Sequence, residues 1–490
     1  MVPVPSPRRR TFATPMAADN LRVMPFIPDT MSSFCSEQLA HWASTLTFED
    51  LPADVVESTK LRILDVIGLA IAGLGTAYGQ SVRTAAIAIG SNGEGRIFGT
   101  GERVGTSAAA CANGALAQAL EFDDTHNESI VHMSSPSVAG ALALAETLRL
   151  SGKRIITAIA LGNEIACRVG SVAPGQFHRR GFHPTGLFAP FGTAYLAGKL
   201  LGLSEEQLVN AAGIVGSFAA GILQCWVDGT DSKYLHSGWA AQSGIVAAFL
   251  GRAGTTGPKA VFEGRFGFMA SHLPEGSTRE FARITDGLGA TWESRRSSFK
   301  PFPAAHVIHP YIDALLRLRQ QHSIDRASVR QIACTVAGYI VPIVCEPVGE
   351  KRRPNSDSHG RVSLQYTLAE AMHAGRLGKD AYQASALQNP EILRLADAVT
   401  YTVDPTFPGP ERFKGQVKIT LANGQTYETI EEHNRGSAEN PMSTADLVAK
   451  FEENVAGILA PARAKQLVAA IFGLEDARDA NALVKMSIGD

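Results

Sequence analysis

The chain has 490 residues, of which 45% are hydrophobic and 19% charged, and its formal net charge is −2 at pH 7. A chain of this length exceeds one ordinary domain, so we expect two domains with large cores. The near-neutral charge gives no electrostatic basis for binding nucleic acid or a membrane surface, and no apolar run reaches the roughly 18 residues of a membrane span. Six scattered cysteines without a C-x-x-C pair favour a reducing compartment.

The first 30 residues carry three consecutive arginines and six prolines, but no apolar segment typical of a secretory signal. Because prolines oppose an amphipathic helix, we predict a disordered extension over residues 1–30. A mitochondrial leader and a functional start at Met31 are the alternatives. The predicted location is cytoplasmic, or mitochondrial if the arginine-rich segment is a leader.

Apolar residues recur at helical spacing through most of residues 31–297. Ser204 and Gln207 have the spacing of a capping box at the start of one helix. The predicted helices cover residues 36–46, 52–73, 106–120, 136–148, 153–169, 192–201, 204–222 and 238–250.

The pattern changes near residue 298, where strand-like segments join the helices. Asn423-Gly424 between two strand-like runs is a strong hairpin signal. The predicted helices of this part cover residues 304–319, 361–374, 390–398, 443–459 and 462–472, and the predicted strands cover 328–336, 399–403, 416–420 and 426–430. We therefore predict a mostly α fold. A large all-α domain of residues 31–297 and 440–490 carries a smaller α+β domain, residues 298–439, inserted before the C-terminal helices.

Between two apolar helices, residues 121–132 hold four carboxylates and two imidazoles. Charged groups beside an apolar core are costly unless they are paired. The run is therefore either a solvated turn that caps two helices or a functional site, and both interpretations stay open. If the run were one helix, Asp124 and Glu128 would share a face, and so would Glu121 and Asp124. Two carboxylates at close range raise the pKa of at least one, which suits acid–base work near neutral pH.

Three other segments combine a histidine or lysine with residues that restrict the backbone. Pro184 places His183 on a stiff loop that suits proton transfer. Lys233 precedes an apolar helix, near whose N-terminus an anion can bind. Lys300 lies beside two prolines, and His309 lies early in the helix that follows. A helix cap, a solvated lysine and a domain hinge are the corresponding structural alternatives.

Common catalytic motifs are missing from the sequence. It contains no G-x-G-x-x-G after a strand, no Walker loop and no G-x-S-x-G elbow. Asp124, His126, Glu128 and His132 are of the types that bind Zn, Mn or Fe, although their spacing matches no standard metal signature. A metal-dependent hydrolase built on these residues is therefore one alternative function.

Four segments, in this order, resemble the MmgE/PrpD family. They are residues 121–132, Gly-Phe-His-Pro-Thr-Gly at 181–186, Lys233 with His236 and Gly238, and Lys300 with Pro303 and His309. With His41-Trp42-Ala43-Ser44 near the start, the resemblance covers about residues 36–475. This family includes 2-methylcitrate dehydratase, cis-aconitate decarboxylase and iminodisuccinate epimerase. The resemblance implies an all-α domain and an α+β lid with the site in the cleft between them, a homodimer, and no metal or organic cofactor.

The resemblance also bears on individual residues. The acidic motif of the family, D-[FY]-[DN]-D-T, falls on residues 121–125, with Glu121 at its first position. The predicted catalytic residues are His132, His183, Asp124 and Lys300, and the predicted substrate-binding residues are Thr125, Lys233, Arg180, His309 and Tyr339. A position that is often cysteine or histidine in the family is Ala305 here, which leaves the substrate open.

In this interpretation the lysines hold substrate carboxylates by charge-assisted bonds, and the histidines move protons at the neighbouring carbon. Asp124 is expected to orient a histidine and raise its pKa. The predicted function is a cofactor-free lyase that dehydrates a citrate or 2-methylcitrate, or decarboxylates a cis-aconitate-type acid. An epimerase of an imino or amino dicarboxylate on the same fold is the alternative, because these reactions can share carbanion-like intermediates. A non-catalytic binding protein is the last alternative.

Overall fold

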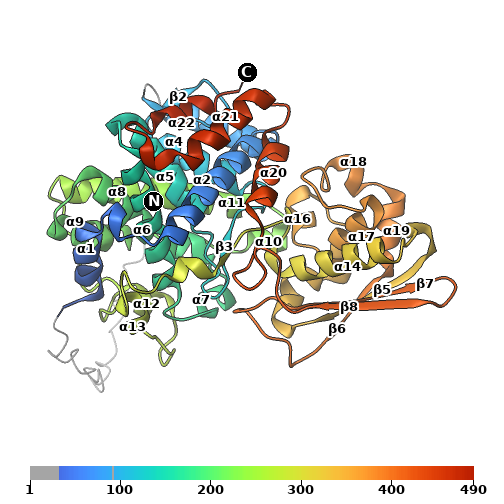
Figure 1. The fold of residues 1–490 in the computed structure, drawn as a ribbon. Coiled ribbons are helices and arrows are strands. Elements are labelled where there is room, and N and C mark those ends of the chain that lie inside the picture. The colour runs from blue at the N-terminus through green and yellow to red at the C-terminus, as the bar shows by residue number, and fades with distance from the viewer. Residues whose placement is uncertain (1–32, 91–92, 490) are drawn as a thin grey trace, which may run out of the picture. The chain divides into compact units, whose positions relative to one another are not determined.

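The computed structural model describes residues 33–90 and 93–489 (Figure 1). The buried hydrophobic residues of this part form two large cores. The predictions for residues 1–30 fall outside the described residues. The larger core is surrounded by long helices: α1 (Cys35–Thr45), α2 (Ala53–Gly73), α3 (Ala77–Ile89), α4 (Thr106–Gln118), α5 (Ser134–Leu148), α6 (Gly152–Gly170), α8 (Pro184–Leu201), α9 (Glu205–Val215), α11 (Ser232–Arg252), α20 (Thr444–Val455) and α21 (Pro461–Phe472). Four short helices lie in the connections, namely α7 (Gln176–Arg179), α10 (Cys225–Asp228), α12 (Phe268–His272) and α13 (Ala282–Thr285), and a fifth, α22 (Asn481–Met486), follows α21.

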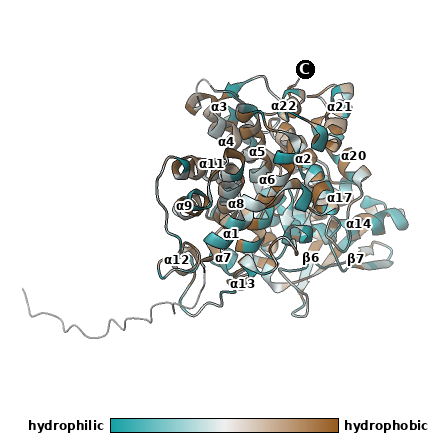
Figure 2. Cartoon of the chain, turned by 60° about the vertical axis from the view of Figure 1, so that its left-hand side comes forward, coloured by the Kyte–Doolittle hydropathy of each residue, from teal (hydrophilic) through white to brown (hydrophobic). Residues whose placement is uncertain are grey.

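Small residues allow the central helices to approach one another closely. A Cβ atom at Gly238 of α11 would lie 2.2 Å from the Cys111 carbonyl oxygen of α4. A Cβ atom at Gly192 of α8 would lie 2.2 Å from the carbonyl oxygen of Gly162 in α6. Figure 2 shows hydrophobic stretches along these central helices, as expected for elements buried on most sides. The glycine- and alanine-rich sequence is therefore used for tight helix packing.

The smaller core lies between helices and one four-stranded sheet. The sheet has the order β6-β5-β7-β8, in which β5 and β6 are parallel and the other pairs are antiparallel. Its strands are β5 (Val329–Val336), β6 (Val399–Val403), β7 (Gly415–Leu421) and β8 (Thr426–Glu431), and the helices are α14 (His309–Gln321), α15 (Val348–Arg352), α16 (Asp357–Arg361), α17 (Leu364–Ala374), α18 (Ala384–Leu387) and α19 (Pro390–Ala398). The hairpin prediction at Asn423-Gly424 is confirmed, with Gly424 at φ +86°.

The two cores draw their residues from different stretches of the chain: the larger core from residues before 293 and after 450, and the smaller core from residues 302–421. After the sheet, the chain returns to the larger core through α20, which packs against α2. The described residues are mainly helical, in agreement with the predicted mostly α fold. The domain boundaries and the role of the smaller part as a lid stay predictions.

Several predicted helix ends need correction. Helix α8 begins at Pro184, not at residue 192, because proline suits the first helical position, where its missing N–H costs nothing. Helix α11 begins at Ser232, so Lys233 lies in its first turn. Helix α9 ends at Val215, and the segment that follows pairs with the loop before α8: the His183 N–H donates to the Gly221 carbonyl, and the Leu223 N–H donates to the Gly181 carbonyl. The capping box predicted at Ser204 is confirmed.

No single helix among the described residues is long and apolar enough to cross a membrane. Helices α2 and α3 meet the criteria of length and composition only as a pair, and the chain bends by 95° between them.

Candidate active site

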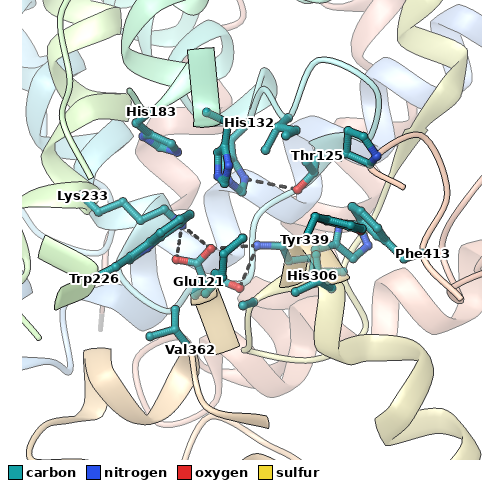
Figure 3. A pocket seen from close by; sticks show the side chains of 17 residues that line it. Glu121, Thr125, His132, His183, Trp226, Lys233, His306, Tyr339, Val362 and Phe413 are labelled. Atoms are coloured by element: carbon teal, nitrogen blue, oxygen red, sulfur yellow. Dashed lines mark hydrogen bonds and ion pairs between the residues drawn. The ribbon is translucent and has the colours of Figure 1, made fainter. Parts of the chain in front are cut away.

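A cavity lies where side chains from both cores meet, and its empty space, including the part that is open to solvent, is about 620 Å³ (Figure 3). Its lining from the larger part consists of Glu121, Thr125, Ile130, His132, His178, His183, Trp226 and Lys233. Its lining from the residues after 298 consists of Lys300, Ala305, His306, Val307, Tyr339, Ile343, Val362, Pro410 and Phe413. Six of the nine predicted site residues therefore line one cavity: Thr125, His132, His183, Lys233, Lys300 and Tyr339.

The acidic run is a buried, irregular turn and not a helix. Glu121 and Ile130 have positive φ angles of 52° and 58°. Between them, β3 (Thr125–His126) pairs antiparallel with β4 (Ser297–Ser298). Both the interpretation as a solvated turn and the helical face for Asp124 and Glu128 are therefore wrong. This segment is shaped by partners that lie far from it in the sequence. The spacing of its residues does not reveal those partners.

The Glu121 carboxylate binds both predicted lysines. Lys233 Nζ donates to the two carboxylate oxygens, and Lys300 Nζ lies 3.1 Å from the Glu121 carbonyl oxygen and 3.3 Å from Oε1. All three side chains are almost completely buried. Lys233 comes from the first turn of α11 and Lys300 from the segment after β4, so only the folded chain brings them together.

Charge pairing overcomes burial in this cluster. Burial alone raises the pKa of Glu121, but Lys233, Lys300 and His132 outweigh it and hold that pKa well below its usual range. Burial likewise opposes a lowered pKa at Asp123, and the imidazole of His132 overcomes it. At Glu121, the raised pKa expected from close carboxylates therefore does not occur. Burial lowers the pKa of Lys300, and Glu121 opposes this shift.

The carboxylate beside His132 is Asp123 and not Asp124. His132 Nδ1 lies 3.3 Å from Asp123 Oδ1 and 2.8 Å from the carbonyl oxygen of Asp124. The carboxylate of Asp124 instead pairs with Arg62 of α2 and accepts a hydrogen bond from Ser134. The expectation that the Asp124 carboxylate orients a histidine is therefore corrected. The turn directs successive carboxylates to opposite sides, and Asp124 anchors the turn to α2.

His183 is the N-cap residue of α8 and is buried, with 1% of its surface exposed. Its Nδ1 lies 2.9 Å from Nδ1 of His236, and its Nε2 has no hydrogen-bond partner among the described residues. Its ring centroid lies 5.6 Å from that of His132. Burial, followed by the positive charge of Lys233, holds the pKa of His183 well below its usual range. The ring is therefore neutral at pH 7, with one free nitrogen beside the cavity.

Two predicted residues, Arg180 and His309, do not line the cavity. Arg180 is exposed after α7 and does not line the cavity. His309 is fully buried behind the cavity wall, where its Nε2 donates to the Ala304 carbonyl at 3.0 Å. His306, three residues earlier in a 3-10 turn, lines the cavity instead. Thr125 does line it, and its Oγ1 lies 3.3 Å from His132 Nδ1.

The residues proposed as metal ligands do not converge. Asp124 pairs with Arg62, and the Glu128 carboxylate pairs with Arg283 and Arg296. His126 contacts Ser129 and Glu293, whereas His132 contacts Asp123. In the part of the chain that the structure describes, no three His, Cys, Asp or Glu side chains form a group suited to a metal ion. These residues therefore do not fit the metal-dependent hydrolase.

Sequence reasoning missed several residues of the site. Asp123 stands beside the chosen Asp124, and no local signal separates the two. His306 stands in the same segment as the chosen His309, and the 3-10 turn decides which ring reaches the cavity. A charged Arg62 inside an apolar helical run was a usable signal for a buried ion pair.

The geometry brings two lysines, both paired with the Glu121 carboxylate, together with two neighbouring imidazoles in one cavity. Profiles of the MmgE/PrpD N-terminal domain and the MmgE/PrpD C-terminal domain match residues 37–280 and 302–474. The chain belongs to the MmgE/PrpD family, which confirms the resemblance noted from the motifs.

Curated relatives extend over almost the whole chain. A cis-aconitate decarboxylase from Aspergillus terreus is 27% identical over 469 residues, which cover 92% of this chain and 95% of that protein. The cis-aconitate decarboxylase of Mus musculus is 26% identical, covering 93% of each chain. That of Homo sapiens is 27% identical, covering 89% of this chain and 90% of the human protein.

Proposed function

We propose that this protein is a lyase that removes carbon dioxide or water from a small di- or tricarboxylate without a metal or organic cofactor. The lyase class rests on the family and on the decarboxylases that match about nine-tenths of the chain. The observation that carries the proposal is the convergence of Lys233 and Lys300 on one carboxylate at the cavity. A buried pair of cations around a carboxylate is a binding arrangement for carboxylic acids.

The proposed chemistry uses three groups of the cavity. In decarboxylation the bond between carbon and the departing carboxylate breaks, carbon dioxide leaves, and the electron pair stays on the substrate carbon. The lysine charges stabilise the anion that this electron pair forms. His183 or His132 then delivers a proton to that carbon. In dehydration the same imidazoles remove a proton beside a carboxylate and protonate the departing hydroxyl group.

The burial of His183 suits this role. A neutral imidazole with a free Nε2 can accept or donate a proton, depending on which of the paired Nδ1 atoms of His183 and His236 carries the hydrogen. In this proposal, the contact with Asp123 orients His132, as a carboxylate partner does. The smaller α+β part serves as a lid that excludes water, and two chains form a homodimer; neither point is needed for the chemistry.

Proton NMR in deuterated water tests the reaction, with citrate, 2-methylcitrate, cis-aconitate and an iminodisuccinate-type acid in parallel tubes. Carbon dioxide release with a new vinyl signal identifies a decarboxylase, and a vinyl signal without carbon dioxide identifies a dehydratase. Deuterium exchange with inversion identifies the alternative, an epimerase. The absence of any change with all four acids contradicts the proposed substrate class.

Variants test the assigned roles. His183→Asn and Lys300→Met should each lower kcat/KM by about a hundredfold or more, the order found for lost proton transfer or lost charge stabilisation. Lys153→Met is the matched control, because Lys153 pairs with Glu49 at the surface, far from the cavity lining. Circular dichroism checks that each variant is folded. Near-normal turnover in folded His183→Asn or Lys300→Met contradicts the assignment.

A further inference from the structure

The two predicted catalytic histidines differ in their partners. His132 Nδ1 lies 3.3 Å from Asp123 Oδ1 and 2.8 Å from the Asp124 carbonyl oxygen. Both oxygens accept hydrogen bonds, and at neutral pH neither carries a proton that it could pass on. His183 Nδ1 instead lies 2.9 Å from Nδ1 of His236, which is another imidazole. Because an imidazole can both take up and release a proton, His183 is the one of the two whose partner can resupply it.

The backbone around residue 221 holds the pair of His183 and His236 in place. The His183 N–H donates to the Gly221 carbonyl at 3.0 Å, and the neighbouring residues Phe182 and Ile222 form a β-bridge. The His236 ring packs against Gly221, where a Cβ atom would lie 3.1 Å from Cγ and Nδ1 of the ring. The two ring centroids are 5.1 Å apart. A glycine that leaves room for the ring therefore keeps the two Nδ1 atoms at hydrogen-bond distance.

The two rings of the pair have different access to the cavity and to solvent. His183 lines the cavity, and its Nε2 is buried without a hydrogen-bond partner among the described residues. His236 is half-buried and does not belong to the cavity lining. Leu235 and Trp239, close to it on α11, are 44% and 43% exposed. The fold thus places one ring at the cavity and the other close to the surface.

Two arrangements of protons are open to this pair. Burial is the main cause that lowers the pKa of His236 to about 4 and that of His183 well below its usual range, so each ring is neutral with one proton at pH 7. In the first arrangement the hydrogen of the contact is on His236 Nδ1, and His183 carries its own proton on Nε2 as a donor. In the second, the hydrogen is on His183 Nδ1, His183 Nε2 is an acceptor, and His236 carries its proton on Nε2. A change from the first to the second delivers a proton at the cavity and takes one up at the surface.

We propose that His236 relays protons from solvent to His183 during decarboxylation. The relay rests on the proposed function and assigns the delivery of the proton to His183. When the bond to the departing carboxylate breaks and carbon dioxide leaves, the electron pair on the substrate carbon takes the proton of His183 Nε2. His183 Nδ1 takes the proton of His236 Nδ1, and His236 Nε2 takes one from water. Each ring ends neutral with one proton, and His236, which acts only through His183, is a positioning residue.

The proton balance connects the relay with one of the proposed reactions. Decarboxylation puts a proton in the place of carbon dioxide, so each turnover takes up one proton. Dehydration and epimerisation give back the protons that they remove, and they need no net supply from solvent. After the product leaves, water that refills the cavity restores the first arrangement by the reverse transfers. The net uptake is therefore one proton for each molecule of carbon dioxide released.

Substitutions of His236 separate a relay from a structural contact, with the acid that releases carbon dioxide as substrate. His236→Gln can still donate a hydrogen bond to His183 Nδ1 but cannot relay a proton, and His236→Phe keeps a ring against Gly221. Both variants should lower kcat by about tenfold or more. KM should change by less than about twofold, because His236 does not line the cavity. A role in hydrogen bonding or packing alone predicts near-normal kcat for one of the two variants.

His236→Ala leaves space for a small molecule in place of the imidazole. Added imidazole should restore kcat of this variant by about tenfold, whereas thiazole, a ring of similar shape that carries no proton at neutral pH, should not. The matched control is His373→Gln, which changes a half-buried histidine that pairs with Glu391 outside the cavity lining. It should behave like the wild type with and without imidazole. Circular dichroism checks that each variant is folded.

The outcomes distinguish the relay from the reaction. If the wild type turns over none of the four acids of the NMR experiment, the proposed function is wrong, and the relay is wrong with it. Turnover without carbon dioxide release overturns the relay alone and leaves a dehydratase standing. Near-normal kcat in folded His236→Gln also overturns the relay. The same conclusion follows if imidazole does not restore His236→Ala, because that result indicates a purely structural role.

Discussion

Glu121 offers the sharpest test of how the site is held together. In Glu121→Gln, Lys233 and Lys300 stay buried side by side without their anionic partner. Removing one partner of a buried ion pair costs about 3–5 kcal/mol, because the remaining charge is uncompensated. For a chain of this size, 1 kcal/mol corresponds to roughly 1 °C of melting temperature. We therefore expect the variant to melt about 3–5 °C lower in a buffer without polyanions.

A carboxylic acid ligand should replace the missing carboxylate. At about 100 times its Kd, a ligand stabilises the folded state by about 2.7 kcal/mol, so added citrate should restore most of the lost melting temperature and stabilise the variant more than the wild type. Differential scanning fluorimetry with and without citrate measures both effects. An unchanged melting temperature in Glu121→Gln, or equal stabilisation of both proteins by citrate, refutes the reasoning.

Glu128→Gln is the matched control for this experiment. Glu128 belongs to the same acidic turn, but its partners Arg283 and Arg296 are 38% and 54% exposed. Ion pairs with exposed partners contribute about 0–1 kcal/mol. The control should therefore melt within about 1 °C of the wild type and show no special response to citrate.

Two further predictions concern stability. Burial first, and then the charge of Lys233, lowers the pKa of His178 and of His236 to about 4, against 6.5 in the unfolded chain. Below pH 6.5 the unfolded state therefore binds more protons than the folded state. The free energy of unfolding keeps its full value above pH 6.5 and falls toward pH 4, by at most about 1.4 kcal/mol per pH unit per histidine. Partial exposure of both rings reduces this slope. Urea midpoints between pH 7.5 and 4.5 measure it, and a flat profile contradicts the prediction. Separately, Gly238→Ala should destabilise the protein by about 1–3 kcal/mol, because its Cβ would overlap the α4 backbone. Gly101→Ala, where no atom lies within 4 Å of the new Cβ, is the thermal-melting control; equal melting temperatures would show that α4 and α11 tolerate separation.

Local signals were sufficient for much of the fold. The capping box at Ser204 and the hairpin at Asn423-Gly424 depend on neighbouring residues alone, and both are confirmed. The order of four short motifs was enough to recognise the family, and each motif contributes at least one residue to the cavity lining. Helix ends near residues 184 and 216 were missed where the backbone of one loop bonds to another loop distant in sequence.

The sequence by itself determined which residue types reach the site, namely two lysines, two histidines and a carboxylate-rich turn. Only the tertiary structure decided which of the neighbours Asp123 and Asp124 contacts His132, because Arg62 of α2 pairs with the Asp124 carboxylate and leaves Asp123 beside the imidazole. It also decided that His306, and not a histidine one helical turn later, lines the cavity. Composition and spacing indicate which chemical groups are present, but the partners of these groups come from segments far apart in the chain. The pairing with those partners sets the direction in which each side chain points, its charge and its protonation state.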